Sequence, residues 1–292
     1  TAATVSTKAI SSSAINTAIA GGNVTAEGGD PVTARGVCWS TSTGPLVTGP
    51  HTTDGAGPGA FDSNITGLLP ASLYFVRAYA TNSKGTTYGN EVSFTTLLGD
   101  IDGNSYEVVT IGDQVWMAEN LATTILNDGT AISNVTVAAG WESSKSPAYA
   151  WYNNDEGANK SRYGALYNWY AVGNEHLCPA GWHVPSEADW NALINYLGGI
   201  DVAGGKLKEA GTVNWLSPNV GATDEKSFTA LPGGGRRPDG NFEDQGRYGV
   251  WWTSTPGGEF SSRGLTMSNE TSSIFIGYSA KETGGAVRCL KD

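Results

Sequence analysis

Tryptophan is distributed very unevenly along this chain. Nine of the ten tryptophans lie beyond residue 100, and Trp39 is the exception. The patterns of apolar and turn-forming residues also change near that point, and 292 residues are enough for two domains, each with a core of its own. We therefore expect two domains of different type, comprising residues 1–97 and residues 98–292.

Up to about Thr96, short apolar runs alternate with turns rich in Gly, Pro, Asn and Asp. Period-2 patterning in runs such as 34–40 and 73–80 predicts a small antiparallel β-sandwich. The sequence Leu69-Pro70 ahead of the strand that bears Tyr74 resembles the corner of a fibronectin type III domain. Cys38 lies in an apolar run, where a lone cysteine most often acts as a small buried hydrophobic residue.

Beyond residue 98 we expect a mostly β domain with two short helices. The first is predicted over 163–172, where Leu166, Trp169 and Tyr170 recur at helical spacing. The second begins after Ser186, a favourable N-cap, and runs over 187–197 until two glycines end it. Its buried stripe is predicted to contain Trp190, Leu193, Ile194 and Leu197.

The charge balance limits the classes of partner. The formal net charge is −11 and no run of basic residues occurs, whereas nucleic acids and anionic membranes attract clustered Lys and Arg. The longest apolar stretches, such as 92–98, are much shorter than the roughly 20 residues that a spanning helix needs. We expect no nucleic-acid partner and no membrane span.

Six ordered motifs in the second segment resemble the Fibrobacter succinogenes major paralogous domain. They are Asp102-Gly103-Asn104-x-Tyr106, Val115-Trp116-Met117-Ala118-Glu119-Asn120-Leu121, Tyr163-Gly164-Ala165-Leu166-Tyr167-Asn168-Trp169, Cys178-Pro179-x-Gly181-Trp182-His183-Val184-Pro185-Ser186, Gly249-Val250-Trp251-Trp252-Thr253-Ser254 and Val287-Arg288-Cys289. The resemblance covers residues 100–292. It implies a C-type-lectin-like architecture, a surface or secreted setting in Bacteroidetes and Fibrobacter-type bacteria, and a disulfide between Cys178 and Cys289.

Aromatic residues with polar neighbours are the first candidates for ligand binding, because sugar rings pack on Trp and Tyr. Such neighbours flank Trp141, Trp151, Tyr152, Trp215 and Tyr248, which are therefore expected to be exposed. The polar segment 233–248 is a predicted recognition loop, with a solvated loop as the alternative. The predicted ligand-binding residues are Trp141, Trp151, Tyr152, Arg236, Arg237, Glu243, Asp244, Arg247 and Tyr248.

No cofactor is expected, with Ca²⁺ as the one alternative. Ca²⁺ prefers carboxylate and amide oxygens, and Asn153-Asn154-Asp155 supplies both without the full spacing of an EF-hand loop. The other acidic stretch, 100–104, is interpreted as a turn in which Asp102-Gly103 precedes a strand.

Signatures of catalysis are missing from the sequence. The three histidines are scattered, and neither a Gly-x-Ser-x-Gly elbow nor a His-Glu-x-x-His motif nor a phosphate loop is present. We expect a non-catalytic adhesion protein, secreted or lipid-anchored at the outer cell surface, that binds an extracellular glycan or a surface protein. The alternatives are a hydrolase or modifying enzyme on the same fold, and a structural subunit of a surface assembly.

Overall fold

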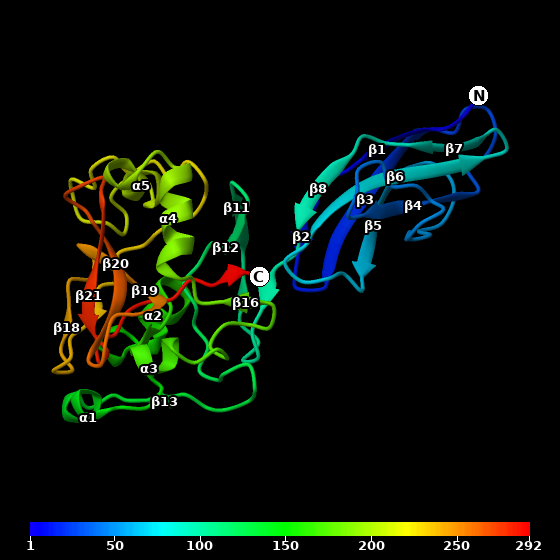
Figure 1. The fold of residues 1–292 in the computed structure, drawn as a ribbon. Coiled ribbons are helices and arrows are strands. Elements are labelled where there is room, and N and C mark those ends of the chain that lie inside the picture. Colours follow the sequence, from blue (N-terminus) through cyan, green and yellow to red (C-terminus); the bar gives the residue numbers. More distant parts are fainter. The chain divides into compact units, whose positions relative to one another are not determined.

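The computed structural model describes all residues from 1 to 292, and most of its regular structure is β-strand. The chain forms two compact units, Thr1–Leu98 and Gly99–Asp292 (Figure 1). The sequence-based boundary, between residues 97 and 98, lies one residue before the boundary in the structure. No helix has the length and apolar character that crossing a membrane requires.

The N-terminal unit is a sandwich of two antiparallel sheets. One sheet has the order β1-β3-β2 with β5 also paired to β3, and the other has the order β4-β6-β7 with β8 also paired to β6. Apolar residues from both sheets, including Val24, Ile65 and Val76, form one buried cluster. The strands are β1 (Thr4–Thr7), β2 (Ser12–Ser13), β3 (Thr17–Ala26), β4 (Ala34–Ser40), β5 (Gly59–Thr66), β6 (Leu73–Asn82), β7 (Gly85–Tyr88) and β8 (Val92–Thr95).

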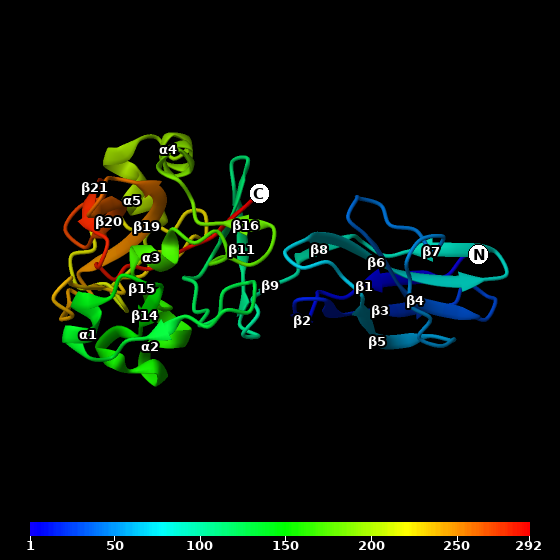
Figure 2. The same ribbon diagram turned by 60° about the horizontal axis from the view of Figure 1, so that its bottom comes forward.

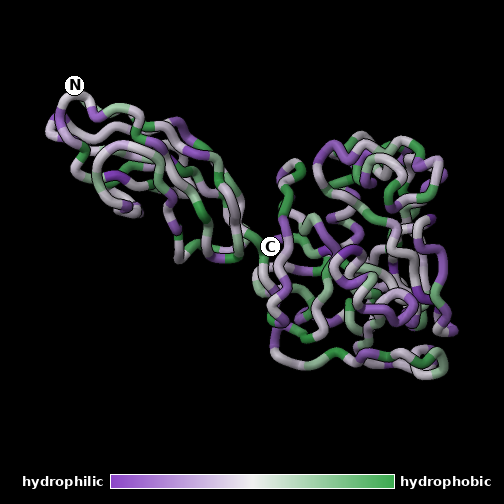
Figure 3. Tube along the Cα trace, turned by 180° about the vertical axis from the view of Figure 1, so that it is seen from behind, coloured by the Kyte–Doolittle hydropathy of each residue, from purple (hydrophilic) through white to green (hydrophobic).

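A tyrosine fixes the corner that leads into β6. The backbone N–H of Leu69 donates a hydrogen bond to the Tyr74 hydroxyl at 3.0 Å, which ties the corner to the strand that follows it. Cys38 is completely buried in β4 and forms no disulfide, as predicted. Figure 3 shows short apolar and polar stretches following one another along the strands of this unit, as expected for strands with one buried face.

The C-terminal unit contains many short strands and five α-helices rather than the two that the sequence predicted. Its helices are α1 (Ala138–Ser143), α2 (Glu156–Tyr163), α3 (Trp169–Val172), α4 (Glu187–Tyr196) and α5 (Ile200–Leu207), with a 3-10 turn at Tyr152–Asn154. Its strands are β9 (Leu98–Gly99, at the boundary), β10 (Ser105–Tyr106), β11 (Val108–Ile111), β12 (Gln114–Met117), β13 (Ser133–Asn134), β14 (Ala148–Ala150), β15 (Leu166–Tyr167), β16 (Trp182–His183), β17 (Gly235–Arg236), β18 (Phe242–Glu243), β19 (Tyr248–Pro256), β20 (Ser261–Ser268), β21 (Ile274–Ala280) and β22 (Leu290–Lys291).

The longest strands of this unit form the antiparallel sheet β19-β20-β21. Helices α4 and α5 cover one face of it (Figures 1 and 2), and their Trp190 and Leu207 share a buried cluster with Trp251 and Leu265 of the sheet. Ser186 caps α4 through a capping box with Asp189, which confirms the predicted start. The predicted stripe of Trp190, Leu193, Ile194 and Leu197 is at most 3% exposed.

The predicted helix over 163–172 is wrong in its first half. Gly164 has φ of +71°, a conformation that ends α2, and Leu166–Tyr167 then form strand β15. Tyr167 exchanges backbone hydrogen bonds with Gly285 at 2.8 and 3.0 Å, so a distant segment draws this stretch into extended structure. The helix resumes as α3, whose N-cap is Asn168.

A second sheet ties the beginning of this unit to its far end. Its order is β11-β12-β22-β16, so β22 lies between two strands from much earlier in the chain. Next to β22, Cys289 forms a disulfide with Cys178, and their Cα atoms are 5.9 Å apart. The predicted pairing is therefore confirmed.

Candidate ligand-binding face of the C-terminal unit

The face of β19-β20-β21 that is turned away from the two helices presents one continuous row of side chains. Val250 pairs with Thr266, and Thr266 pairs with Phe275, so these three lie side by side across the sheet. Because alternate strand residues point to opposite faces, their neighbours Trp251 and Leu265 enter the core instead. The ring of Phe275 is 70% exposed. We call this surface the β19–β21 face.

A cavity of about 210 Å³ adjoins the row. It is lined by Gly235, Arg236, Glu243, Asp244, Tyr248, Val250, Thr266 and Thr283. Tyr248 is two residues from Val250 on the same strand and therefore points to the same face, where it is 37% exposed. The carboxylates of Glu243 and Asp244 are exposed beside it. The arrangement joins exposed rings, hydroxyls and hydrogen-bond-accepting carboxylates in one place.

The structure brings together only part of the predicted site. Glu243, Asp244 and Tyr248 line the cavity. Arg237 is exposed outside it, with ion pairs of 3.4 Å to Asp239 and 3.7 Å to Glu243. Arg247 is exposed and is not part of the lining. The two outer arginines thus lie at the edge of the site rather than inside it.

Trp141 and Arg236 are each only 1% exposed, so the expected exposure of Trp141 is wrong, while Arg236 lines the cavity as a buried side chain. The Arg236 guanidinium lies over Trp141, 4.4 Å from the centroid, and over Phe242 at 4.7 Å. It donates hydrogen bonds to the carbonyls of Gly240, Val135 and Thr136. Burial lowers the pKa of Arg236 to about 10. These residues hold the segment around α1 against the body of the unit.

Trp151 and Trp215 were also expected to be exposed, and both are buried, at 2% and 1%. Trp151 packs edge-on against Tyr149, and the Trp215 indole donates to the carbonyl of Ala230 at 2.9 Å. Tyr152 is half-buried, with its ring 5.4 Å from that of Phe242. Polar neighbours in the sequence were a poor guide to the exposure of Trp151 and Trp215. Residues next to each other in the chain point in different directions, so a polar neighbour can be exposed while the indole is buried.

The three residues considered for Ca²⁺ serve the start of α2. The Asp155 carboxylate accepts from the backbone of Ala158 at 3.0 Å and so caps the helix, while the Asn154 amide donates to the carbonyl of Thr136. Asn153 and Asn154 have φ of 52° and 56°, which short polar side chains tolerate. The chain contains no group of three or more His, Cys, Asp or Glu side chains arranged to hold a metal ion. The arrangement gives the Ca²⁺ prediction no support.

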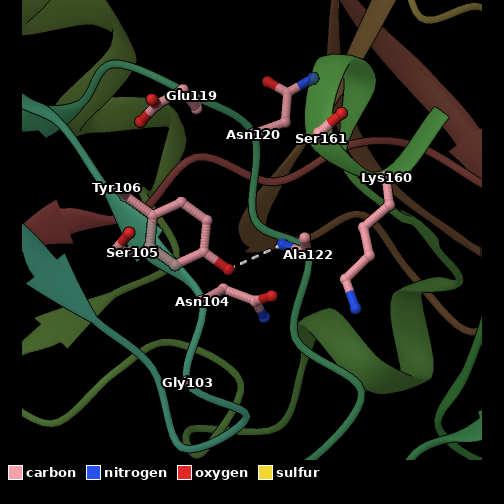
Figure 4. A pocket seen from close by; sticks show the side chains of 9 residues that line it. All are labelled: Gly103, Asn104, Ser105, Tyr106, Glu119, Asn120, Ala122, Lys160 and Ser161. Carbon is pink, nitrogen blue, oxygen red and sulfur yellow. Dashed lines mark hydrogen bonds between the residues drawn. The ribbon is translucent and has the colours of Figure 1, made fainter. Parts of the chain in front are cut away.

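A polar recess of about 320 Å³ lies where several of the sequence motifs meet (Figure 4). Its lining comprises Gly103, Asn104, Ser105, Tyr106, Glu119, Asn120, Ala122, Lys160 and Ser161. The Tyr106 hydroxyl donates to Asp100 at 2.6 Å and accepts from the backbone of Ala122 at 3.0 Å. Asp100 also accepts from Asn104, so the acidic stretch forms the expected turn. Most polar side chains of this recess are already bound to residues outside its lining, such as Asp100, Glu107 and Glu156.

Asn120, at the back of the recess, connects four distant parts of the unit. Its Oδ1 accepts from Trp251 Nε1 and from Arg288 Nε, each at 2.9 Å, and its Nδ2 donates to the carbonyl of Tyr163 at 2.8 Å. Arg288 is fully buried, and burial lowers its pKa to about 9. Several motifs quoted from the sequence therefore meet in a structural hydrogen-bond hub, and two of their tryptophans, Trp116 and Trp251, belong to the core.

Phe275 and Thr266 are the principal residues of the face that the sequence did not single out. Alternation in Ile274-Phe275-Ile276 places the phenylalanine on the face opposite the two isoleucines. Alternation shows that two faces exist but does not show which face a helix covers.

The family comparison matches the C-terminal unit. Residues 109–291 match the Fibrobacter succinogenes major domain. The chain therefore belongs to this family. A search among curated proteins gave no match.

Two similar solved structures each cover about a third of the chain. The sensor domain of an anti-sigma factor from Pseudobacteroides cellulosolvens is 14% identical, with 34% of this chain and 97% of that chain covered and a TM-score of 0.27. The fibronectin type III domain of human fibronectin type III domain containing protein 3 is 16% identical, with 33% and 87% covered and a TM-score of 0.24. The structural neighbours thus include fibronectin type III domains.

Proposed function

We propose that the protein is a non-catalytic binding protein, secreted or held at the outer cell surface, whose β19–β21 face recognises an extracellular glycan. The observation that supports this most directly is the exposure of Tyr248 beside the carboxylates of Glu243 and Asp244, with the exposed ring of Phe275 next to Thr266 on the same face. Sugar rings stack their C–H faces on such aromatic rings, and carboxylates accept hydrogen bonds from sugar hydroxyls.

The same proposal includes the architecture and the setting of the C-terminal unit. We infer a C-type-lectin-like arrangement, in which short strands and loops present a binding surface on a core closed by a disulfide. The Cys178–Cys289 bond supports an oxidising compartment, because disulfides persist mainly in secreted and surface proteins. The sandwich unit then acts as a spacer between this domain and an anchor upstream.

The test is a glycan array and a polysaccharide pulldown with the whole chain, its Phe275→Ala and Tyr248→Ala variants, and Phe260→Ala as the control. Phe260 is 74% exposed but lies in the turn before β20, outside the face. We expect the two face variants to lose binding while the control retains it, with thermal unfolding unchanged in all three. Binding is expected to be the same with Ca²⁺ and with chelator.

Two outcomes would count against the proposal. If the wild-type chain binds no glycan, the glycan proposal fails and an extracellular protein becomes the partner to test. If glycan binding survives in both face variants, the ligand lies elsewhere on the molecule.

A further inference from the structure

The largest of the cavities described in the C-terminal unit lies apart from the β19–β21 face. It has a volume of about 570 Å³, within the range of small-molecule sites. Its lining comprises Trp169, Val172, Gly173, Asn174, Glu175, Trp182, His183, Val184, Ser254, Pro256 and Asp292. Since α3, β16 and the residues that directly follow them supply most of this lining, we call it the α3–β16 cavity.

The walls of this cavity are aromatic and aliphatic. Two indoles, Trp169 and Trp182, stand with Val172, Val184 and Pro256. The Trp169 indole N–H donates to the carbonyl of Thr253 at 3.2 Å, which fixes the plane of a half-buried ring. The ammonium of Lys281 lies 4.8 Å from the centroid of that ring. The chain therefore already uses this indole as a cation–π surface.

The rim of the cavity carries negative charge. Glu175 and Asp292 are exposed carboxylates, and the lining includes neither Lys nor Arg. His183 is the one histidine in the lining. Its Nδ1 lies 2.7 Å from Asp292 Oδ1 and its Nε2 lies 3.5 Å from Asp189 Oδ2, so both ring nitrogens face carboxylates. Glu175 forms no salt bridge. Its charge is free to pair with a ligand.

We propose that the α3–β16 cavity binds an organic cation, an ammonium group carried on a compact apolar body. Indole faces attract cations through the ring quadrupole, and the two rim carboxylates add Coulomb attraction of the same sign. An anion would meet repulsion at the rim. A neutral apolar molecule would fill the walls but would gain no Coulomb attraction from the rim. The inference concerns another surface than the glycan proposal and does not depend on it.

The probes are choline and 3,3-dimethyl-1-butanol, which has the same shape with a neutral carbon in place of the nitrogen. Binding to the whole chain is measured by titration calorimetry and by tryptophan fluorescence. We expect choline to bind saturably and the neutral isostere to bind about tenfold more weakly, since a partly desolvated cation–π contact and a carboxylate each contribute. Glucose serves as a neutral hydroxyl-rich probe.

Two variants locate the site. Glu175→Gln removes a rim charge at an exposed position, and we expect it to weaken choline binding about threefold to tenfold. Glu142→Gln makes the same change of net charge on the exposed surface of α1, outside the cavity, and should leave binding unchanged. Both replacements keep the fold, because neither carboxylate is buried.

The proposal is overturned if choline and its isostere bind equally well, or if glucose binds and choline does not. Equal weakening by Glu175→Gln and Glu142→Gln would overturn it as well, because the effect would then reflect net charge alone. The absence of saturable choline binding in the millimolar range would have the same consequence.

Discussion

The Cys178–Cys289 disulfide allows the sharpest quantitative prediction. The bond closes a loop with a sequence separation of 111 residues. In the chain-entropy account, a loop of that length restricts the unfolded chain enough to stabilise the folded state by about 4.8 kcal/mol at 25 °C. Domains are usually stable by about 5–15 kcal/mol, so the bond supplies a large part of the stability of the C-terminal unit.

The variant to measure is the double replacement Cys178→Ala with Cys289→Ala, unfolded in guanidinium chloride. Tryptophan fluorescence reports mainly on the C-terminal unit, because nine of the ten tryptophans lie beyond residue 100. We expect the free energy of unfolding of that unit to fall by about 4 to 5 kcal/mol. A strong reductant should lower the stability of the wild-type chain by a similar amount and leave the double variant unchanged.

Cys38→Ser is the matched control, because Cys38 is a buried cysteine that forms no disulfide and belongs to the other unit. It should not move the tryptophan transition of the C-terminal unit. A loss below about 1 kcal/mol in the double variant would refute the loop-entropy reasoning, as would a reductant effect of the same size in both proteins.

Three further changes test the buried network and one ion pair. Asn120→Ala removes the acceptor of two buried donors, one of them on Trp251, and should cost at least about 3 kcal/mol in chemical denaturation. Lys208→Met leaves three carbonyls without the ammonium that binds them at 2.7 to 3.0 Å, and a loss of about 3 to 5 kcal/mol is expected from the same measurement. Arg263 donates two hydrogen bonds to Glu187 and lowers the pKa of that carboxyl. The ion pair therefore stabilises the fold at pH values above the usual carboxyl pKa. This stabilisation is lost as the pH falls through the lowered pKa of Glu187. Glu187→Gln should therefore cost about 1 kcal/mol at pH 7 and nothing in strong acid, and a thermal-unfolding difference that persists at low pH would contradict this.

Local signals predicted those elements whose stabilising contacts lie close in the sequence. Helix α4 is the clearest example, because Ser186 and Asp189 cap it within one turn and its apolar stripe repeats at helical spacing. The corner at Tyr74 is similar, since donor and acceptor are five residues apart. The family motifs also predicted the disulfide, which the structure contains.

Elements determined by distant contacts were not predicted correctly. Residues 163–172 have helical spacing, yet Tyr167 pairs with Gly285 and lies in a strand. Trp141 has polar neighbours in the sequence, but the guanidinium that covers it comes from Arg236. Burial of an indole depends on partners that local composition does not reveal. For the same reason Phe275 could be assigned to one side of a strand but not to the uncovered side.

The position of β22 between β12 and β16 has a consequence for biogenesis. Because Trp116 pairs with Leu290, the sheet that starts near residue 108 stays incomplete until residues 290–291 have been synthesised. Contacts between such distant residues make folding slow, since a long loop must close before any of them forms. During synthesis this sheet remains without its closing strand, so we expect a deletion that removes Leu290 and Lys291 to lower the free energy of unfolding of the unit.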